Sequence, residues 1–353
     1  MPGEGLPIMR IAIHHRQGSF SAYWIEWCER EGVDHVVVDA YRSDIVPHLR
    51  SLGCVGLMWP WHQTNFADQL FARQLTLALE NAGIKVFPDV RTAWHFDDKV
   101  GQKYLFEAIG VPFVKTDVFY DRATALAWVE TCAYPIVHKL RGGAASQSVH
   151  LVRTPAEARA VVKRAFGRGF PPVDLHALTR EAVWKLRRDL DLKSLLRVPY
   201  AAARALLNVK PRRAALRPPE RGYVYFQAFV DGNPFDDRFV VIGDRCFCVR
   251  RFVRTGDFRA SGSGKWSHER SQFPAKSIAL AFDVAKRIGS QSLALDVIYD
   301  AAGDPLCVEV SYAFPKGPFL EAARGYVDPA GVWHDTDQPP PMYMVEDFVA
   351  SIS

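Results

Sequence analysis

The sequence has no long apolar run and no paired cysteine motif. Its longest apolar stretches, such as Cys54 to Trp61, are far too short to span a bilayer, and Met1 to Arg10 lacks the apolar run of a secretory signal. The one close cysteine pair, Cys246 and Cys248, has no second pair to complete a zinc site. We therefore expect a soluble cytoplasmic protein with buried thiols and no disulfide framework.

Several catalytic motifs are also missing. The sequence has no G-x-G-x-x-G after a strand, no H-E-x-x-H and no G-x-S-x-G, which are the motifs of dinucleotide, zinc-protease and hydrolase sites. The segment Ser261 to Lys265 (SGSGK) looks like a P-loop, but Arg259 stands where its first glycine would fall and Trp266 follows the lysine. A Walker A site is therefore excluded.

Composition indicates a globular chain with one unusually basic segment. With 353 residues, 48% of them hydrophobic, the chain can bury a large core in two or three subdomains, and disorder, collagen and coiled coil are excluded. Residues 151–220 carry 16 Lys and Arg against 6 Asp and Glu, so the rest of the chain is net acidic although the whole is +5. This asymmetry suggests a module with its own partner or surface.

The first 90 residues alternate short apolar strands with helical patterns. Strand signals cover Met9–His14, His35–Asp39, Cys54–Trp59 and Ile84–Phe87, and helix signals cover Ser21–Arg30 and Phe66–Asn81. This order predicts a small parallel α/β domain. Its strand ends carry His14, His15, Arg16, Trp59, Trp61 and His62. Such ends either bind a ligand, as in other open α/β sheets, or simply cap and pack the sheet edge.

From Asp98 onward the pattern becomes mixed. A helix is expected over Asp98–Ile109, and a strand over Tyr134–Leu140 leads through the small-residue loop Arg141–Ser148 into Val149–Val152. Further strands are expected over Tyr223–Val230, Arg238–Ile242 and Cys246–Val253, a helix over Pro274–Ile288, and a hairpin over Leu293–Ser311. Lys139, in an apolar strand before the loop, needs an anionic partner, and the loop N–H groups can wrap phosphate oxygens.

The hairpin places two acidic side chains together. A two-residue turn at Ala302-Gly303 sets Asp296 directly opposite Glu309, with Ser311 on the same face as Glu309. Opposed like charges destabilise a sheet, so the pair needs a cation, and two acids beside phosphates commonly hold Mg²⁺. If the register shifts by one residue, both acids are instead solvated.

Taken in order, these segments resemble the ATP-grasp superfamily, most closely its RimK-like branch of amino-acid ligases, from Asp98 onward. The matching pieces are Asp98-Lys99 opening a helix that ends in Gly-Val-Pro, Pro135–Lys139 with Gly142-Gly143, Phe226–Val230, Asp236–Arg238 with Val240–Gly243, and Gly256–Arg259. Asp296, Glu309 and Ser311 fall where the family has its Asp, Glu and Asn metal ligands. The resemblance implies a mixed α/β and α+β ATP-grasp fold. Its parts would be a pre-ATP-grasp, Rossmann-like domain (1–95), a lid domain (96–222) with a basic helical insertion at about 165–220, and a catalytic domain (223–353).

The resemblance also implies a role for each site residue. Lys99 and Lys139 would hold the ATP phosphates, the backbone at Gln227, Phe229 and Val230 would read adenine, and Asp236 would lie near the ribose. Arg238 and Arg259 would neutralise the transferring phosphoryl group, and Asp296, Glu309 and Ser311 would bind one or two Mg²⁺ ions, with Mn²⁺ as a substitute.

The activity implied is ADP-forming ligation of a carboxylate to an amine or a thiol through an acyl phosphate. The motifs specify the nucleotide half, so both small-molecule substrates and the oligomeric state stay open. Two residues depart from the family pattern, since Ser311 replaces the usual Asn and Ala228 the common acidic residue of the hinge. Ser311 motivates the alternative of a catalytically weak ATP-binding regulatory or scaffold protein.

Two segments have no assigned role in the nucleotide half. The basic insertion is expected to present a plain soluble surface, a dock for a large anionic acceptor, or a membrane-surface contact. Nucleic-acid binding is disfavoured because aromatic residues are not interleaved with the basic ones. The tail Gly325–Met344 either closes over an acceptor site or forms an ordered surface loop.

Overall fold

The computed structural model describes residues 9–62, 65–143, 149–171, 218–253, 263–315 and 324–352, together with the single positions 183, 186, 199 and 317. The chain divides into two compact units. The first combines the described residues of Met1–His62, Ala67–Val114 and Val230–Ser353, and the second contains those of Gln63–Phe66 and Lys115–Phe229. Most of the basic insertion lies outside the described residues, so its helical pattern stays a prediction.

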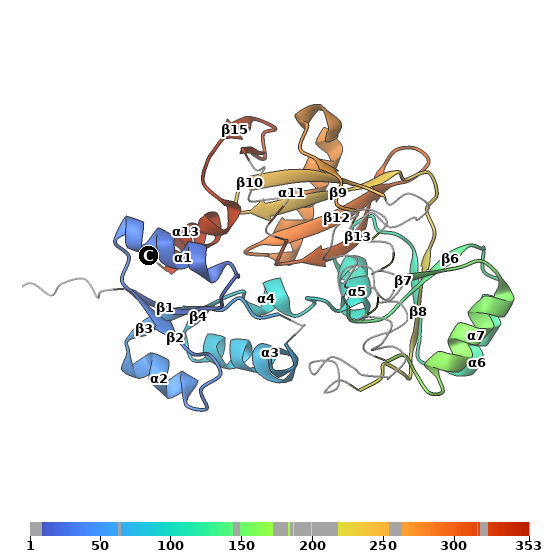
Figure 1. Cartoon of the computed structure of the whole chain (residues 1–353), viewed down its shortest axis with the longest axis horizontal. Helices are drawn as coiled ribbons and strands as arrows, with labels where there is room; N and C mark the ends of the chain where they lie inside the picture. The colour runs from blue at the N-terminus through green and yellow to red at the C-terminus, as the bar shows by residue number, and fades with distance from the viewer. Residues whose placement is uncertain are drawn as a thin grey trace, which may run out of the picture. The chain divides into compact units, whose positions relative to one another are not determined.

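The amino-terminal part of the first unit is the expected parallel α/β sheet (Figure 1). Its strands are β1 (Arg10–His14), β2 (His35–Val38), β3 (Cys54–Met58) and β4 (Lys85–Phe87), in the order β2-β1-β3-β4. The helices are α1 (Ser21–Glu31), α2 (Ile45–Ser51), α3 (Phe66–Asn81) and α4 (Val90–Ala93). The predicted strands and long helices are confirmed, while α2 gave no clear signal because Pro47 interrupts its short sequence.

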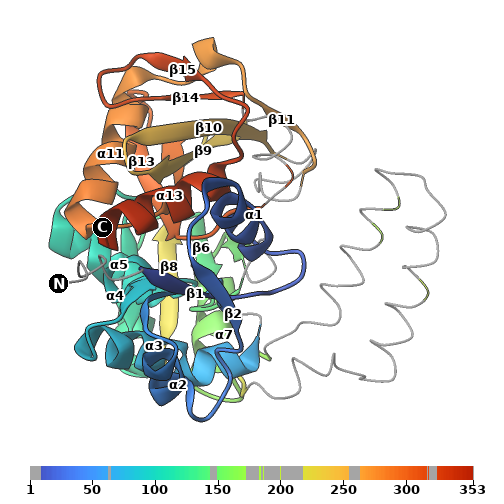
Figure 2. The same ribbon diagram turned by 90° about the vertical axis from the view of Figure 1, so that its left-hand side faces the viewer.

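A seven-stranded sheet forms the rest of the first unit. Its strands are β9 (Phe235–Ile242), β10 (Arg245–Phe252), β11 (Trp266–Ser267), β12 (Leu293–Tyr299), β13 (Pro305–Ser311), β14 (Gly325–Val327) and β15 (Trp333–Asp335). The main path runs β13-β12-β9-β10-β14-β15, and β11 also pairs with β10. Helices α5 (Lys99–Ile109), α11 (Ala275–Ile288) and α13 (Pro340–Ile352), with the 3-10 turn η1 (Arg270–Gln272), complete the unit. The tail is thus ordered, with β14 and β15 extending the sheet beside β10 and α13 lying alongside α1 (Figure 2).

The two faces of this sheet pack against different partners because side chains alternate along each strand. Val240, Ile242 and Val249 join the core of the amino-terminal sheet, together with Trp24, Trp59 and Trp61. Phe239 and Val241 pack instead against α5 and α11. The predicted strand-end tryptophans Trp59 and Trp61 are therefore core residues, each about 1% exposed. The polar site described below lies on the first of these faces, beyond the apolar residues.

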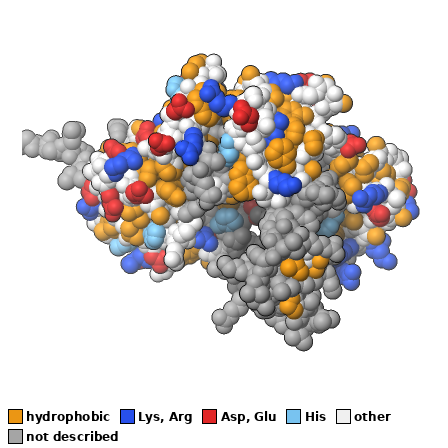
Figure 3. All heavy atoms as spheres, turned by 45° about the horizontal axis from the view of Figure 1, so that its top comes forward, with side chains coloured by type: hydrophobic (Ala, Val, Ile, Leu, Met, Phe, Trp, Pro, Cys, Tyr) orange, Lys and Arg blue, Asp and Glu red, His pale blue; other side chains and the backbone are white. Residues whose placement is uncertain are grey.

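The second unit contains an antiparallel sheet of four strands in the order β5-β8-β6-β7. These are β5 (Thr116–Phe119), β6 (Ile136–Lys139), β7 (Val149–Val152) and β8 (Val224–Ala228), and helices α6 (Arg122–Val129) and α7 (Pro155–Ala165) pack on them. Asp121 and Thr154 begin the two helices by accepting a hydrogen bond from the backbone three residues later. None of the helices in the described part of the chain combines the length and apolar character that crossing a membrane requires. Figure 3 shows basic and acidic side chains mixed over the described surface it displays.

Burial of His138 in the second unit predicts a pH-dependent stability. Burial, with His150 and Arg164 nearby, lowers the pKa of His138 to about 3. In the unfolded chain this histidine is protonated below its usual pKa of about 6.5, whereas in the folded protein it stays neutral over most of that range. The unfolded state therefore binds more protons, and the free energy of unfolding falls as the pH drops. We expect a loss of about 2 to 3 kcal/mol between neutral pH and about pH 4.5.

Urea denaturation of wild type and His138→Phe at both pH values checks this expectation. Phenylalanine suits the aromatic neighbours Phe170 and Phe226 and should remove this part of the pH dependence. His150, the exposed cross-strand neighbour of His138, provides the control variant His150→Gln, which should keep the acid-induced loss. Identical pH profiles in all three proteins would contradict the prediction.

Candidate active site

The hairpin brings Asp296 and Glu309 directly opposite each other, as predicted. The predicted two-residue turn is wrong, however. Near the turn, Tyr299 pairs with Pro305, which leaves a five-residue connection and a register one residue away from the expected one. A bulge between Asp296 and Val297 then restores the expected pairing at the acids. The two acids therefore face each other because the bulge compensates for the longer turn.

Asp296 lies in a buried network of charges formed across β9, β10 and β12. Arg238 binds its carboxylate in a bidentate arrangement at 2.6 and 2.7 Å, and Arg251 Nη2 donates to it at 2.9 Å. Arg251 also binds Asp236 through two hydrogen bonds of 2.6 Å. The strands enforce this order, because Arg238 is the cross-strand partner of Asp296 and Arg251 that of Asp236. Two acids and two arginines thus alternate on one sheet face.

The arginines keep Asp296 ionised. Burial opposes the charge on Asp296, but the guanidinium groups of Arg238 and Arg251 outweigh it and hold the pKa of the carboxyl below its usual range. In the same way, burial works against the charge on Arg251, yet Asp296 and Asp236 raise its pKa above the ordinary value. Asp296 and Arg251 therefore supply fixed, oriented charges near neutral pH. Asp236 differs, because burial raises the pKa of its carboxyl above the usual value in spite of Arg251.

Lys99 extends the charged face from the start of α5. Its Nζ lies 3.4 Å from Glu309 and 3.9 Å from Asp97, and its side chain is 7% exposed. Asp98 fixes the beginning of the helix by accepting a hydrogen bond from the N–H of Gly101 at 2.9 Å. The Gln102 amide donates to the carbonyl of Val310, next to Glu309, at 2.8 Å. The helix start and β13 are thereby held together, and Lys99 is set against Glu309.

The metal-ligand set predicted from the sequence fits Mg²⁺ only in part. Asp296 and Glu309 offer facing carboxylates of the kind that Mg²⁺ prefers, although both Asp296 oxygens already accept hydrogen bonds from arginines. The Ser311 hydroxyl donates a hydrogen bond to the carbonyl of Ala313, two residues further along the chain, at 2.7 Å. In the described part of the chain, no group of three or more His, Cys, Asp or Glu side chains could hold a metal. A metal here would need ligands from a bound phosphate or water.

A second charge cluster lies on the opposite face of the same strands. Arg250 binds Asp237 in a bidentate arrangement at 2.8 and 2.9 Å, and the Tyr299 hydroxyl donates to the same carboxylate at 2.5 Å. The Asp237 side chain is completely buried. This face is the one covered by α11, with Phe239 and Phe273 nearby. This cluster also pairs a buried acid with an arginine, as the Asp296 network does. Its acid, Asp237, lies on the sheet face opposite to the predicted nucleotide site.

The predicted phosphate-binding residues Lys139 and Gly142 belong to the second unit. Lys139 ends β6 opposite Tyr225 and is 7% exposed. The backbone N–H groups of Arg141 and Gly142 donate to the carboxylate of Glu220, at 2.9 and 3.3 Å, and the Tyr223 hydroxyl also binds Glu220. The start of the loop therefore holds an anionic group of the chain itself. Residues 144–148 lie outside the described residues.

The predicted adenine hinge lies where the two compact units join. Gln227 is buried in β8 and donates to Thr116 at 3.0 Å, and the boundary between the units falls between Phe229 and Val230. Arg259 and its Gly-Asp-Phe-Arg segment lie outside the described residues. The predicted residues of the first unit are Lys99, Val230, Asp236, Arg238, Asp296, Glu309 and Ser311, and those of the second are Lys139, Gln227 and Phe229.

Sequence reasoning missed three residues that shape the site. Arg251 was an unremarked residue of a β pattern, although it links Asp236 to Asp296. The other two are Gln102 and Glu220, whose side chains bond the backbone of Val310 and Arg141, respectively, in segments distant in the sequence. An unexpected run of two arginines, Arg250-Arg251, in a strand that is otherwise apolar was the one available signal, because each must meet an acid on its own face.

No family model matches the sequence, and no curated protein matches it. Solved structures do match the fold. A RimK-domain ATP-grasp protein from Sphaerobacter thermophilus is 18% identical with a TM-score of 0.56, covering 97% of this chain and 99% of its own. The ATP-grasp ligase PsnB in complex with a minimal precursor is 15% identical with a TM-score of 0.53, covering 97% and 99%.

D-cycloserine synthetase DcsG is 12% identical with a TM-score of 0.56, covering 98% of this chain and 100% of its own. One PsnB structure, with a TM-score of 0.52, also contains Mg and ADP. Together these likenesses show that the chain has the ATP-grasp fold, which confirms the fold predicted from its sequence.

Proposed function

We propose that the protein is an ATP-dependent ligase that joins a carboxylate to an amine through an acyl phosphate, releasing ADP and phosphate. The observation that carries the proposal is the alternating network of Asp236, Arg251, Asp296 and Arg238, with Lys99 and Glu309 beside it, in a chain of ATP-grasp fold. Fixed cations and carboxylates on one sheet face are what phosphoryl transfer requires, since its catalysis is mostly positioning and charge stabilisation.

In this proposal the side chains act without becoming covalent intermediates. Lys99 would neutralise phosphate oxygens, and Arg238 and Arg251 would orient Asp296 while adding positive potential where charge develops. Lys139 and the loop after it would contact the phosphates, displacing the Glu220 carboxylate from the loop N–H groups. The backbone near Phe229 and Val230 would receive adenine. Arg259 would complete the cationic set.

Asp296 and Glu309 are the residues proposed to hold Mg²⁺, which would neutralise phosphate charge when bound. Ser311 is the weakest member of this set, because its hydroxyl is bonded to Ala313. We therefore favour one ion held by Asp296 and Glu309 over two ions, with phosphate oxygens and water completing its coordination.

The same observation on Ser311 favours a second candidate. A protein that binds ATP tightly but turns it over slowly would serve a regulatory or scaffold role. Loss of a ligand for a second ion would lower turnover more than nucleotide binding. The two candidates differ in turnover and share the fold.

Product analysis separates them. The purified protein would be incubated with Mg²⁺, ATP and panels of carboxylates with and without amines, and the nucleotide products resolved by chromatography. We expect ADP and phosphate that appear only when both substrates are present. AMP and pyrophosphate would reject the acyl phosphate route, and tight ATP binding without turnover across the panel would favour the regulatory candidate.

Replacement of Lys139 tests the proposed phosphate contact. Lys139→Ala should weaken ATP binding by about 1.5 to 3 kcal/mol, because a charge-assisted contact to phosphate is lost. Lys139→Met keeps more of the buried stem and should show the same loss. The measurement is calorimetric titration with a non-hydrolysable ATP analogue, and Lys163→Ala, on the exposed side of α7, is the control. Wild-type affinity for the ATP analogue in both Lys139 variants would contradict the phosphate contact and leave Lys139 with a structural role only.

A further inference from the structure

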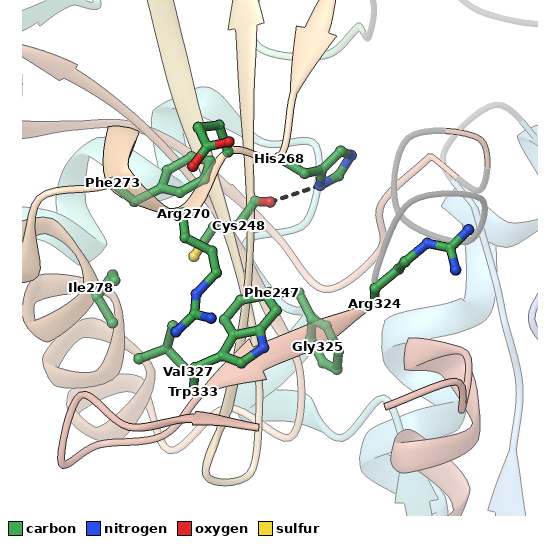
Figure 4. Close-up of a pocket in the computed structure, with 11 residues that line it drawn as sticks. Phe247, Cys248, His268, Arg270, Phe273, Ile278, Arg324, Gly325, Val327 and Trp333 are labelled. Atoms are coloured by element: carbon green, nitrogen blue, oxygen red, sulfur yellow. Dashed lines mark hydrogen bonds between the residues drawn. The ribbon is translucent and has the colours of Figure 1, made fainter. Parts of the chain in front are cut away.

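A cavity of about 300 Å³ lies at the edge of the seven-stranded sheet, within the first unit. Its walls include the apolar side chains of Phe247, Phe273, Ile278, Val327 and Trp333, together with Cys248 (Figure 4). The volume matches the lower range of small-molecule sites, and the mainly apolar lining with a few polar groups is typical of them.

The cavity exists because the edge of β10 is covered by two separate strands. β14 pairs with β10 at Cys246, and β11 pairs with it at Arg250 and Arg251. Between these points, the carbonyl of Cys248 receives the Nδ1 of the His268 side chain at 3.0 Å (Figure 4). A side chain thus replaces a strand there and leaves space next to it.

The wall formed by Trp333 is held in place from three directions. Its indole lies so close to Gly325 that a Cβ on that residue would fall 2.2 Å from the ring. Its Nε1 donates to Asp335 at 2.8 Å, and the Arg270 guanidinium lies 4.3 Å from its ring centre. The cavity is therefore preformed, which lowers the entropic cost of binding a ligand.

The rim of the cavity is positively charged. Arg270 and Arg324 both line it, and among the described residues neither has an acidic side chain within ion-pair distance. The acid that lines the cavity, Glu269, accepts a hydrogen bond from Ser271 at 3.2 Å. Figure 4 shows Arg270 reaching toward Trp333 and Arg324 at the other end. An apolar pocket with arginines at its mouth suits a ligand with an apolar body and one carboxylate.

We propose that this cavity is a second ligand site, which binds a small apolar carboxylate such as an aryl or branched alkyl acid. The apolar body would lie among Phe247, Phe273 and Trp333, with the carboxylate at Arg270. Cys248 and Phe273 belong to the sheet face covered by α11, and Phe247, on the other face, packs against Tyr326 and Tyr343. Neither Arg251 nor Asp296 lines the cavity. The site is therefore separate from the proposed nucleotide site, and its occupancy does not depend on ligase activity.

Binding to the intact protein tests the proposal. Phenylacetate, indole-3-acetate and 4-methylpentanoate would be titrated by calorimetry, with phenylacetamide as the neutral counterpart of phenylacetate. We expect at least one acid to bind saturably with a Kd of about 1 mM or lower, and the amide about tenfold more weakly than phenylacetate if phenylacetate is that acid. Arg270→Gln should remove the preference for the acid, and Val327→Phe, which fills the cavity, should abolish binding.

Arg287→Gln is the matched control, because Arg287 lies on the exposed side of α11 and pairs with Asp283 away from the cavity. It should bind like wild type, and all variants should bind the ATP analogue normally, which shows that they are folded. The proposal would be overturned by absence of saturable binding of every acid to wild type. Undiminished binding to folded Val327→Phe, or equal binding of phenylacetate and phenylacetamide, would overturn it as well.

Discussion

Asp296→Asn should reduce ligase turnover by about 100-fold or more, because it removes the acid that two arginines orient and that is proposed to hold Mg²⁺. It should also lower the free energy of unfolding by about 3 to 5 kcal/mol, since Arg238 and Arg251 lose their shared partner in a buried setting. The measurements are ADP release at saturating ATP and urea denaturation.

Asp237→Asn separates the two effects. Asp237 lies on the opposite face of the same strand, is fully buried, and pairs with Arg250 and Tyr299. Its loss should destabilise the protein by a similar amount, while the fraction that stays folded keeps most of its turnover. Wild-type turnover per folded molecule in Asp296→Asn would show that Asp296 acts through stability alone.

Glu309→Gln should also reduce turnover by about 100-fold, with a smaller loss of ATP affinity. The reason is that Glu309 faces Asp296 across the hairpin and lies 3.4 Å from Lys99, so the amide removes a proposed metal ligand and leaves Lys99 with one fewer counter-charge. Stability should change less than in Asp296→Asn, because the Glu309 side chain is 33% exposed. Turnover and analogue binding would be measured across a range of Mg²⁺ concentrations.

The same helix provides the control. Glu107 pairs with Lys103 at 2.8 Å on α5 and is 44% exposed, so Glu107→Gln removes a carboxylate–lysine pair without touching the charged face. Exposed pairs contribute less than about 1 kcal/mol, and this variant should behave like wild type. Wild-type turnover in Glu309→Gln would rule out Glu309 as a metal ligand.

The sequence predicted most of the elements that build the site, because their signals are local. Asp98 and Gly110 mark the ends of α5, and both act there as caps. The pairing of Asp296 opposite Glu309 was also predicted, but the five-residue connection and the bulge that produce it were not. A local pattern shows neither the longer connection nor the bulge that corrects it. Next to the bulge, the backbone of Cys307 is bonded to Pro112 and Val114, which are distant in the sequence.

The charge network could not be predicted because its members are distant in sequence. Arg251 meets Asp296 only when β10, β9 and β12 have paired, and a one-residue slip would turn it to the face of α11. Asp236, predicted near a ribose, is bound to Arg251 in the structure. Strand order and register, which single-sequence patterns specify poorly, decide these contacts.

Apart from the short stretch Gln63–Phe66, the chain passes between its two compact units near Val114 and near Val230. The two passages are joined: the N–H of Ala228 donates to the carbonyl of Lys115 at 2.8 Å, and Thr116 and Gln227 are paired in register just beyond. Both ends of the Lys115–Phe229 segment are therefore held by one piece of sheet, and a substitution that breaks this pairing would release the two ends of the segment together.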